Sequence, residues 1–223
     1  MELARGLGRR FVVAAALLSV TDIFLWLFRV LLTGTNRYSF IIWNLTLAWI
    51  SFEMAYLLVR NLRKVRWASW ENILLSLLWL AFLPNSWYVL TDFIHIVPNG
   101  EISQLYDIVL MTILVFNGFL LGFAGLFLIH RELLKRFGFL KSYLAVQGII
   151  LISSFAIYLG RDLRWNTWDV IANPQGVIIN VSDQIIDPLG NPRALNVTIL
   201  FFILISVIYA AFIILTYPSK RRS

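Results

Sequence analysis

The sequence has no cysteine, only two histidines and few charged residues. The lack of cysteine excludes disulfides, iron–sulfur centres and thiol nucleophiles. Two histidines, His95 and His130, are too few for a zinc site built from several histidines. Charged residues make up 14 % of the chain and hydrophobic residues 60 %, and the mean hydropathy is +0.78. A soluble domain of 223 residues could not hide so much apolar surface from water, so the composition predicts a membrane protein.

Long apolar runs set the expected fold. A bilayer core about 30 Å thick needs roughly 20 apolar residues per helix. We therefore predict an all-α, polytopic membrane helix bundle of about six transmembrane helices, which forms a single integral membrane domain over residues 1–223. The expected spans are 11–32, 39–59, 71–96, 106–129, 143–160 and 195–217. The connection 161–194 is the longest, carries the turn signals NPQG and DPLGNP, and is expected to be an external loop.

The basic residues predict the orientation of these spans. Fourteen of the 19 Lys and Arg fall before the first span, between the second and third, between the fourth and fifth, or after the sixth. By the positive-inside rule both termini are then cytoplasmic, and the loops 33–38, 97–105 and 161–194 lie outside. The net charge of +7 thus follows membrane topology, which makes the lipid bilayer the expected partner and argues against nucleic acid. The oligomeric state does not follow from the sequence.

The third span carries an unusual motif, PNSWYVLTDFIH at 84–95. Proline removes a backbone donor and clashes with the preceding turn, so we expect the third helix to be broken near Pro84. A simple proline kink in a packed bundle is the alternative. At 100° per residue, one face of the helix after Pro84 is polar. This polar face comprises Asn85, Tyr88, Thr91, Asp92 and His95.

A second motif, YLGRDLRWNTWD at 158–169, follows the fifth span. Arginine donates in a fork that matches phosphate or carboxylate, and tryptophan favours the membrane interface. The motif therefore suits an anionic headgroup. The alternative is an aromatic belt in which the arginines pair with neighbouring aspartates. The candidate ligand-binding residues of this motif are Arg161, Arg164, Trp165, Asn166 and Asp169.

Both motifs end at the predicted outer face, to which the short loop 97–105 also brings Asp107. We expect them to form one outward-facing pocket in which Asp92, His95 and Asp107 are the candidate catalytic residues. The same three side chains would be the ligands if a divalent cation is the cofactor, and an oxygen-rich set favours Mg²⁺, Mn²⁺ or Ca²⁺. The structural alternative is that Asp92 and His95 pair with Arg161, or with each other, and lock the bundle.

Four polar residues and a glycine motif lie inside the spans. Asp22 lies near the middle of the first span, and Asn44 and Glu53 lie in the second. Such residues are costly in lipid, so we expect them to face a protein partner or water. A buried packing contact and a proton or ion pathway both remain open for Asp22 and Glu53. Asn117 precedes Gly118 and Gly122, whose spacing predicts close helix packing.

The two motifs resemble the signatures PN-x-x-Y-x-x-TD-x-x-H and YLGR-x-LRWN-S-WD of domain of unknown function 1361, a family of multi-spanning bacterial membrane proteins. The resemblance extends from about the second span to residue 174, with Thr167 in place of the usual serine. It implies a multi-pass protein of the bacterial cytoplasmic membrane and brings no established activity.

Three functions fit these patterns. The first is an enzyme that acts on a lipid-linked or phosphorylated envelope substrate at the outer leaflet, with the anionic lipid or lipid-linked compound held by the arginines. The second is a transporter or lipid flippase, because the third span is interrupted and Asp22, Glu53 and Asn117 lie at depth. The third is a non-catalytic envelope scaffold, in which both motifs serve packing.

Overall fold

A computed structural model describes residues 2–98, 100–165, 172–173, 175–176, 179, 181–182, 184 and 190–216. Every regular element in this part of the chain is helical, as the composition predicts. The elements are α1 (Glu2–Thr33), α2 (Phe40–Asn61), α3 (Trp70–Tyr88), the 3₁₀ helix η1 (Val89–His95), α4 (Gln104–Asp162) and α7 (Pro192–Thr216). Five helices in the described part are long and apolar enough to cross a membrane.

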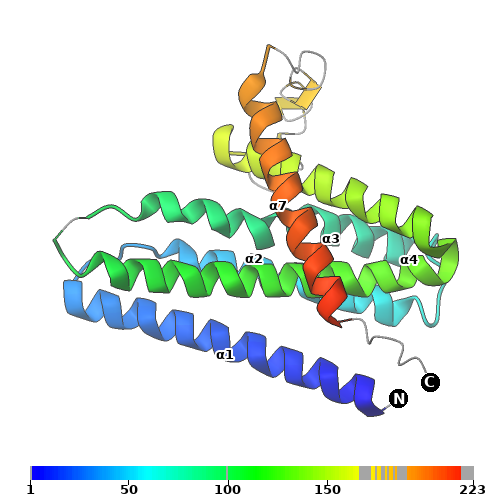
Figure 1. Cartoon of the computed structure of the whole chain (residues 1–223), viewed down its shortest axis with the longest axis horizontal. Helices are drawn as coiled ribbons and strands as arrows, with labels where there is room; N and C mark the ends of the chain where they lie inside the picture. The colour runs from blue at the N-terminus through cyan, green and yellow to red at the C-terminus, as the bar shows by residue number, and fades with distance from the viewer. Residues whose placement is uncertain are drawn as a thin grey trace.

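α4 covers two of the predicted spans. Its 59 residues run through a single non-helical position, Gly138, with φ 73° and ψ −179°. At 1.5 Å per residue, a straight helix of this length would be far longer than a bilayer is thick. Instead the chain reverses at Gly138, so that the two halves of α4 run back along each other (Figure 1). The basic segment before Gly138 is therefore helical.

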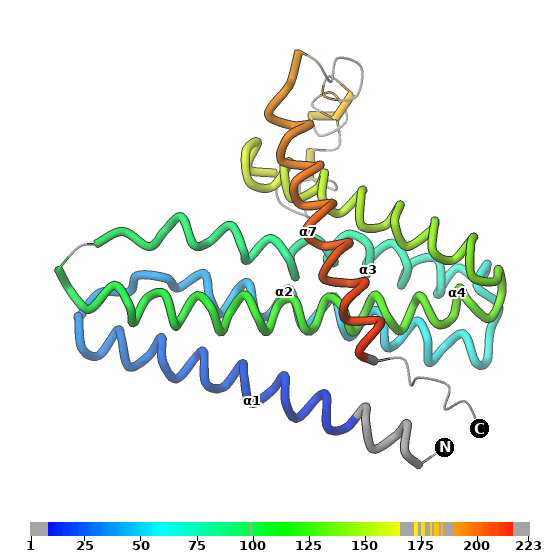
Figure 2. Tube along the Cα trace, in the orientation of Figure 1, coloured from blue at the N-terminus to red at the C-terminus, as the bar shows by residue number. Residues whose placement is uncertain are grey.

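The first three helices and the first half of α4 form an elongated bundle (Figures 1 and 2). α4 is its centre, because it contacts α1, α2, α3, η1 and α7. α7 crosses the bundle obliquely and packs against α4. The core between α3, α4 and α7 is aromatic, with the Phe123 ring 5.6 Å from Trp87 and 5.8 Å from Tyr209.

The glycines of α4 permit the close helix packing that the sequence predicts. A Cβ on Gly118 would lie 2.5 Å from the backbone oxygen of Ser86, and one on Gly122 would lie 2.7 Å from Trp87 Nε1. Both distances are too short for any side chain. α3 therefore lies against the glycine face of α4, with Trp87 fully buried between them.

Pro84 does not break the third helix, contrary to our expectation. It lies buried inside α3, which continues to Tyr88 and tightens to 3₁₀ geometry only at Val89. The missing backbone N–H costs one hydrogen bond, and the tight packing of the turns beyond Pro84 against α4 stabilises the helix there. The Asn85 side chain also donates to the Phe82 carbonyl at 3.3 Å.

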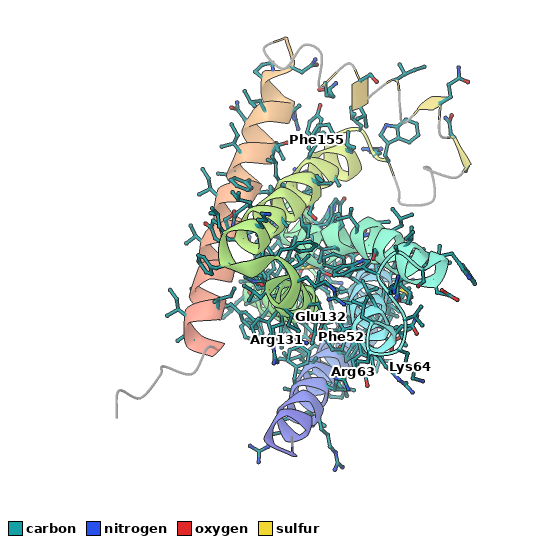
Figure 3. All side chains as sticks on the ribbon, turned by 90° about the vertical axis from the view of Figure 1, so that its right-hand side faces the viewer. Phe52, Arg63, Lys64, Arg131, Glu132 and Phe155 are labelled. Atoms are coloured by element: carbon teal, nitrogen blue, oxygen red, sulfur yellow. The ribbon has the colours of Figure 1, made fainter. Side chains whose placement is uncertain are left out.

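The two ends of the bundle differ in charge. The connection 62–69 and Gly138 lie at one end, on the right in Figure 1, and the connections 34–39 and 96–103 lie at the other. Figure 3 looks onto the first end, where Arg63, Lys64 and Arg131 gather. This separation agrees with the orientation that the basic residues predict, in which the end with Arg63 faces the cytoplasm. We call the opposite end the outer end.

Candidate functional site at the outer end of the bundle

The two sequence motifs meet at the outer end. A Cβ on Gly160 would lie 3.6 Å from the Tyr88 ring, so this ring packs directly on the last turns of α4. The charges of Arg161 and Arg164 both act on Tyr88, and that of Arg161 also acts on Asp92. Segments more than seventy positions apart in the sequence thus form neighbouring surfaces.

Asp92 is the buried carboxylate of this region. It is 3 % exposed and accepts a hydrogen bond from Asn44 Nδ2 of α2 at 2.6 Å. The sequence suggested an interhelical hydrogen bond for Asn44, and the structure confirms it. Thr91, the residue before Asp92, is also buried. Because Asn44 occupies one carboxylate oxygen, it fixes the orientation of Asp92.

The two arginines of the second motif keep their donors available. Among the described residues, neither guanidinium forms a hydrogen bond or ion pair, although Arg161 is half-buried. Asp162 pairs instead with Arg193 at the start of α7, so the local pair between Arg161 and Asp162 does not form. Arg164 is exposed and adopts φ 58°, a left-handed conformation that costs a non-glycine residue about 1 kcal/mol.

The external connection packs back on the second motif. The Tyr158 hydroxyl donates to Gln184 at 3.2 Å. A Cβ on Gly176 would lie 2.9 Å from the edge of the Trp165 ring, and the Gly176 N–H donates to the Asn173 side chain at 3.1 Å. Gly176, the last residue of the NPQG signal, thus lies beside Trp165. The candidates Asn166 and Asp169 lie outside the described residues.

His95 and Asp92 do not share an environment. His95 is exposed at the end of η1, with its ring 5.3 Å from that of Phe40, whereas Asp92 is buried. A 3₁₀ helix places residues i and i+3 on the same face, so the change of helix type does not separate these two side chains. They differ in their position along η1, because Asp92 lies inside the bundle and His95 lies at the exposed end of the helix.

Asp107 belongs to a separate buried cluster, which the sequence analysis missed. Arg29 of α1 donates from Nε to Asp107 Oδ1 at 2.8 Å and from Nη2 to Glu101 at 3.1 Å. The Tyr38 hydroxyl donates to Asp107 Oδ2 at 2.9 Å, and the Arg29 guanidinium lies 4.8 Å from the centre of the Tyr38 ring. Arg29 is fully buried. Its place inside an apolar span was the available signal, since a buried arginine requires a partner.

The Arg29 cluster also contacts the end of η1. Tyr38 lies between α1 and η1, 3.3 Å from the His95 carbonyl oxygen, which also accepts from Arg37 at 3.0 Å. Burial, together with the hydrogen bond to Asp107, raises the pKa of Tyr38 to about 12. The phenol is therefore a permanent donor at neutral pH, and Asp107 positions the end of η1 through it.

The predicted metal ligands are not brought together. Asp107 is engaged by Arg29 and Tyr38, Asp92 by Asn44, and His95 points to the surface. The part of the chain that the structure describes contains no group of three His, Cys, Asp or Glu side chains placed to hold a metal ion. Of these three side chains, Asp92 keeps a carboxylate oxygen without a donor among the described residues, so a cation at this site would need oxygens from a ligand.

The fold and this site define a membrane helix bundle with a polar, arginine-bearing outer end. The sequence matches the family described as "Protein of unknown function (DUF1361)" over residues 43–208, which includes both motifs, so the chain belongs to this family. It matches no curated protein and no solved structure.

Proposed function

We propose that the protein binds an anionic compound, lipid-linked or phosphorylated, at the outer end of its bundle and acts on it as a membrane enzyme. The observation that supports this best is the position of Arg161 and Arg164. Neither guanidinium is bonded to another described residue; both charges act on Tyr88, and that of Arg161 also acts on Asp92. A half-buried guanidinium that has no anion among the described residues is suited to an anionic ligand, because arginine matches phosphate and carboxylate oxygens in a fork.

Each residue would have a separate role. Arg161 and Arg164 hold the anion, and Tyr88 donates or accepts a hydrogen bond beside it. Asp92 acts as the acid or base, because it is a buried carboxylate on which the charge of Arg161 acts, and Asn44 holds its orientation. Further contacts to the ligand would come from Asn85, Thr91, His95, Trp165, Asn166 and Asp169. A divalent cation would bind Asp92 together with phosphate oxygens of the ligand, as Mg²⁺ commonly does.

The proposed setting is the bacterial cytoplasmic membrane. With the end that carries Arg63 and Lys64 inside, the site with Asp92 faces the outer leaflet, where lipid-linked envelope precursors present their headgroups. Trp165 would lie at the membrane interface, which tryptophan favours.

The experiment compares site variants in a deletion strain and in purified protein. Asp92→Asn and Arg161→Gln are expected to abolish complementation, and Arg161→Gln is expected to reduce co-purification of anionic lipids, measured by native mass spectrometry. Arg193→Gln is the control, because Arg193 is an exposed arginine at the same end whose partner is Asp162. Full complementation by Asp92→Asn together with unchanged lipid binding by Arg161→Gln would contradict the proposal.

A transporter is the second candidate, because Asp22 and Asn117 are fully buried in the apolar bundle. Glu53 does not support it, since its side chain is exposed on α2, where the apolar surroundings would be lipid. Transport predicts that Asp22→Asn impairs function as severely as Asp92→Asn. An enzyme confined to the outer leaflet predicts that only Asp92→Asn does so.

A further inference from the structure

A second polar cluster lies in the middle of the bundle, away from the outer end. Ser19 and Asp22 are three residues apart on α1, so their side chains lie on one helix face, one above the other. Asn117 of α4 donates from Nδ2 to Ser19 Oγ at 2.7 Å, and Trp49 of α2 donates to the same oxygen at 2.9 Å. Three helices thus contribute polar groups at the depth of Asp22.

This central cluster has more acceptors than donors. Ser19 Oγ already accepts twice, and its own hydrogen is donated to the Ala15 carbonyl at 3.0 Å. Three buried oxygens then have no donor among the described residues: both carboxylate oxygens of Asp22 and Oδ1 of Asn117. Asp22 and Asn117 are both 0 % exposed. A buried acceptor left without a donor costs about 1–3 kcal/mol, and more when it is charged.

No cation among the described residues compensates a charge on Asp22. The nearest basic residue on α1 is Arg29, two turns away and engaged by Asp107 and Glu101. On α4 the charged residue between the start of the helix and Asn117 is Asp107, which is paired with Arg29. The charged residues of α2 are Glu53 and Arg60, and both side chains are exposed.

We propose that Asp22 and Asn117 form a reversible proton-binding site at the middle of the membrane. The proton binds the Asp22 carboxylate, which becomes a neutral carboxyl group. Its O–H is then the donor that the acceptor-rich cluster lacks. Oδ1 of Asn117, whose Nδ2 bonds Ser19 one turn from Asp22, is a buried oxygen without a donor among the described residues and would accept it. The proposal does not depend on the outer-end site, because it uses none of that site's residues.

A proton fits the cluster better than a metal cation. Na⁺ or a divalent ion needs several oxygen ligands around one point, whereas Ser19 Oγ is occupied and Trp49 brings an N–H donor to it. A proton needs only one donor–acceptor pair. It also removes the charge whose burial in the apolar bundle would be most costly.

The test is infrared spectroscopy of the full-length protein in lipid, as the buffer is stepped from about pH 5 to about pH 9. Wild type is expected to show a protonated-carboxyl C=O band that falls as the pH rises and returns when the pH is lowered. Asp22→Asn is expected to lack this band, and Asp22→Glu, which keeps the carboxyl group, to shift it. The shift gives a second readout should Asp22→Asn fold poorly.

Two controls separate Asp22 from other groups. Asp92→Asn is expected to keep the band, because Asp92 lies in the outer-end site. Thr21→Val is also expected to keep it, because Thr21 is exposed and bonds the Leu17 carbonyl of its own helix. The proposal is wrong if wild type and Asp22→Asn give the same spectra, or if the band does not respond to pH. Loss of the band on adding Na⁺ at constant pH and ionic strength would assign the site to sodium and also overturn it.

Discussion

Arg29 and Asp107 form a buried ion pair that joins the first and fourth helices, with Arg29 Nε 2.8 Å from Asp107 Oδ1 and both side chains nearly inaccessible. The pair belongs to a polar network at the outer end, in which Thr35 also donates to Glu101 at 3.2 Å and Arg37 donates to the His95 carbonyl at 3.0 Å. It therefore makes the arrangement of α1, α4 and η1 sensitive to a small number of substitutions.

Removal of one partner should be more harmful than removal of both. Arg29→Met leaves Asp107 buried without its cation, which is expected to cost about 3–5 kcal/mol. The double variant Arg29→Met with Asp107→Leu should recover part of this loss, because no charge remains buried. Thermal unfolding in detergent measures the difference. Arg10→Met, at an exposed position of the same helix, should change stability by less than about 0.5 kcal/mol, and an equally small effect of Arg29→Met would contradict the role of the pair.

The raised pKa of the Tyr38 phenol predicts that the stability of the folded protein depends on pH in the alkaline range. Its pKa is about 12 in the folded protein and about 10 in an unfolded chain, so the folded state binds the phenolic proton more tightly. The resulting stabilisation is complete below about pH 10 and is lost as the pH rises through about 12. Tyr38→Phe should therefore be less stable than wild type at neutral pH, and the gap should narrow above about pH 10. Titration of tyrosinate absorbance should show that this variant lacks the most alkaline transition of the folded protein.

The Asn44–Asp92 hydrogen bond can be tested by exchange of the two residues. Asn44→Asp places two carboxylates together and is expected to destabilise the fold and to abolish complementation. Asn44→Asp with Asp92→Asn restores a donor and an acceptor and should recover stability. Complementation should stay absent if Asp92 itself supplies the acid or base. Recovery of stability and activity together would show that only the hydrogen bond matters.

The close approach of α3 and α4 predicts that alanine substitutions at two glycines of α4 have different effects on stability. Gly122→Ala places a methyl group against Trp87 Nε1, and overpacking of this kind costs about 1–3 kcal/mol. A Cβ on Gly148, in the second half of α4, meets nothing within 4 Å. Gly148→Ala should thus be neutral or stabilising by up to about 1 kcal/mol, as helix propensity predicts. Equal effects in unfolding measurements would contradict the packing.

The helical fold could be predicted because it depends on local properties: the length of apolar runs, the position of basic residues and the glycine spacing of α4. The continuation of α3 past Pro84 could not, since the missing hydrogen bond is offset by packing of Trp87 against Gly122, a contact between distant segments. The hydrogen bond from Asn44 to Asp92 likewise joins residues 48 positions apart. The sequence indicated that Asn44 and Asp92 each needed a polar partner, and only the fold determines that they bond to each other.

Arg29 shows the same limit of prediction from sequence. Its position inside an apolar span is a signal for a buried partner, but Asp92, Asp107 and Asp169 were all expected at the same end, so the sequence does not say which one. In the structure Arg29 pairs with Asp107 and Glu101, whereas Asp92 bonds Asn44. The predicted site thus divides into a cluster that holds η1 and a surface formed by η1 with the end of α4.

Gly138 connects the two halves of α4 with no intervening loop, in a conformation open essentially to glycine alone. The length of the helix that follows Gly138 therefore determines where the residues at its far end lie. Each residue inserted into the helix between Gly138 and Arg161 would move this arginine by about 1.5 Å along the axis and turn it by about 100°. The position of Arg161 relative to Asp92 at the outer end thus depends on the number of residues between Arg161 and Gly138, which lies at the opposite end of the molecule.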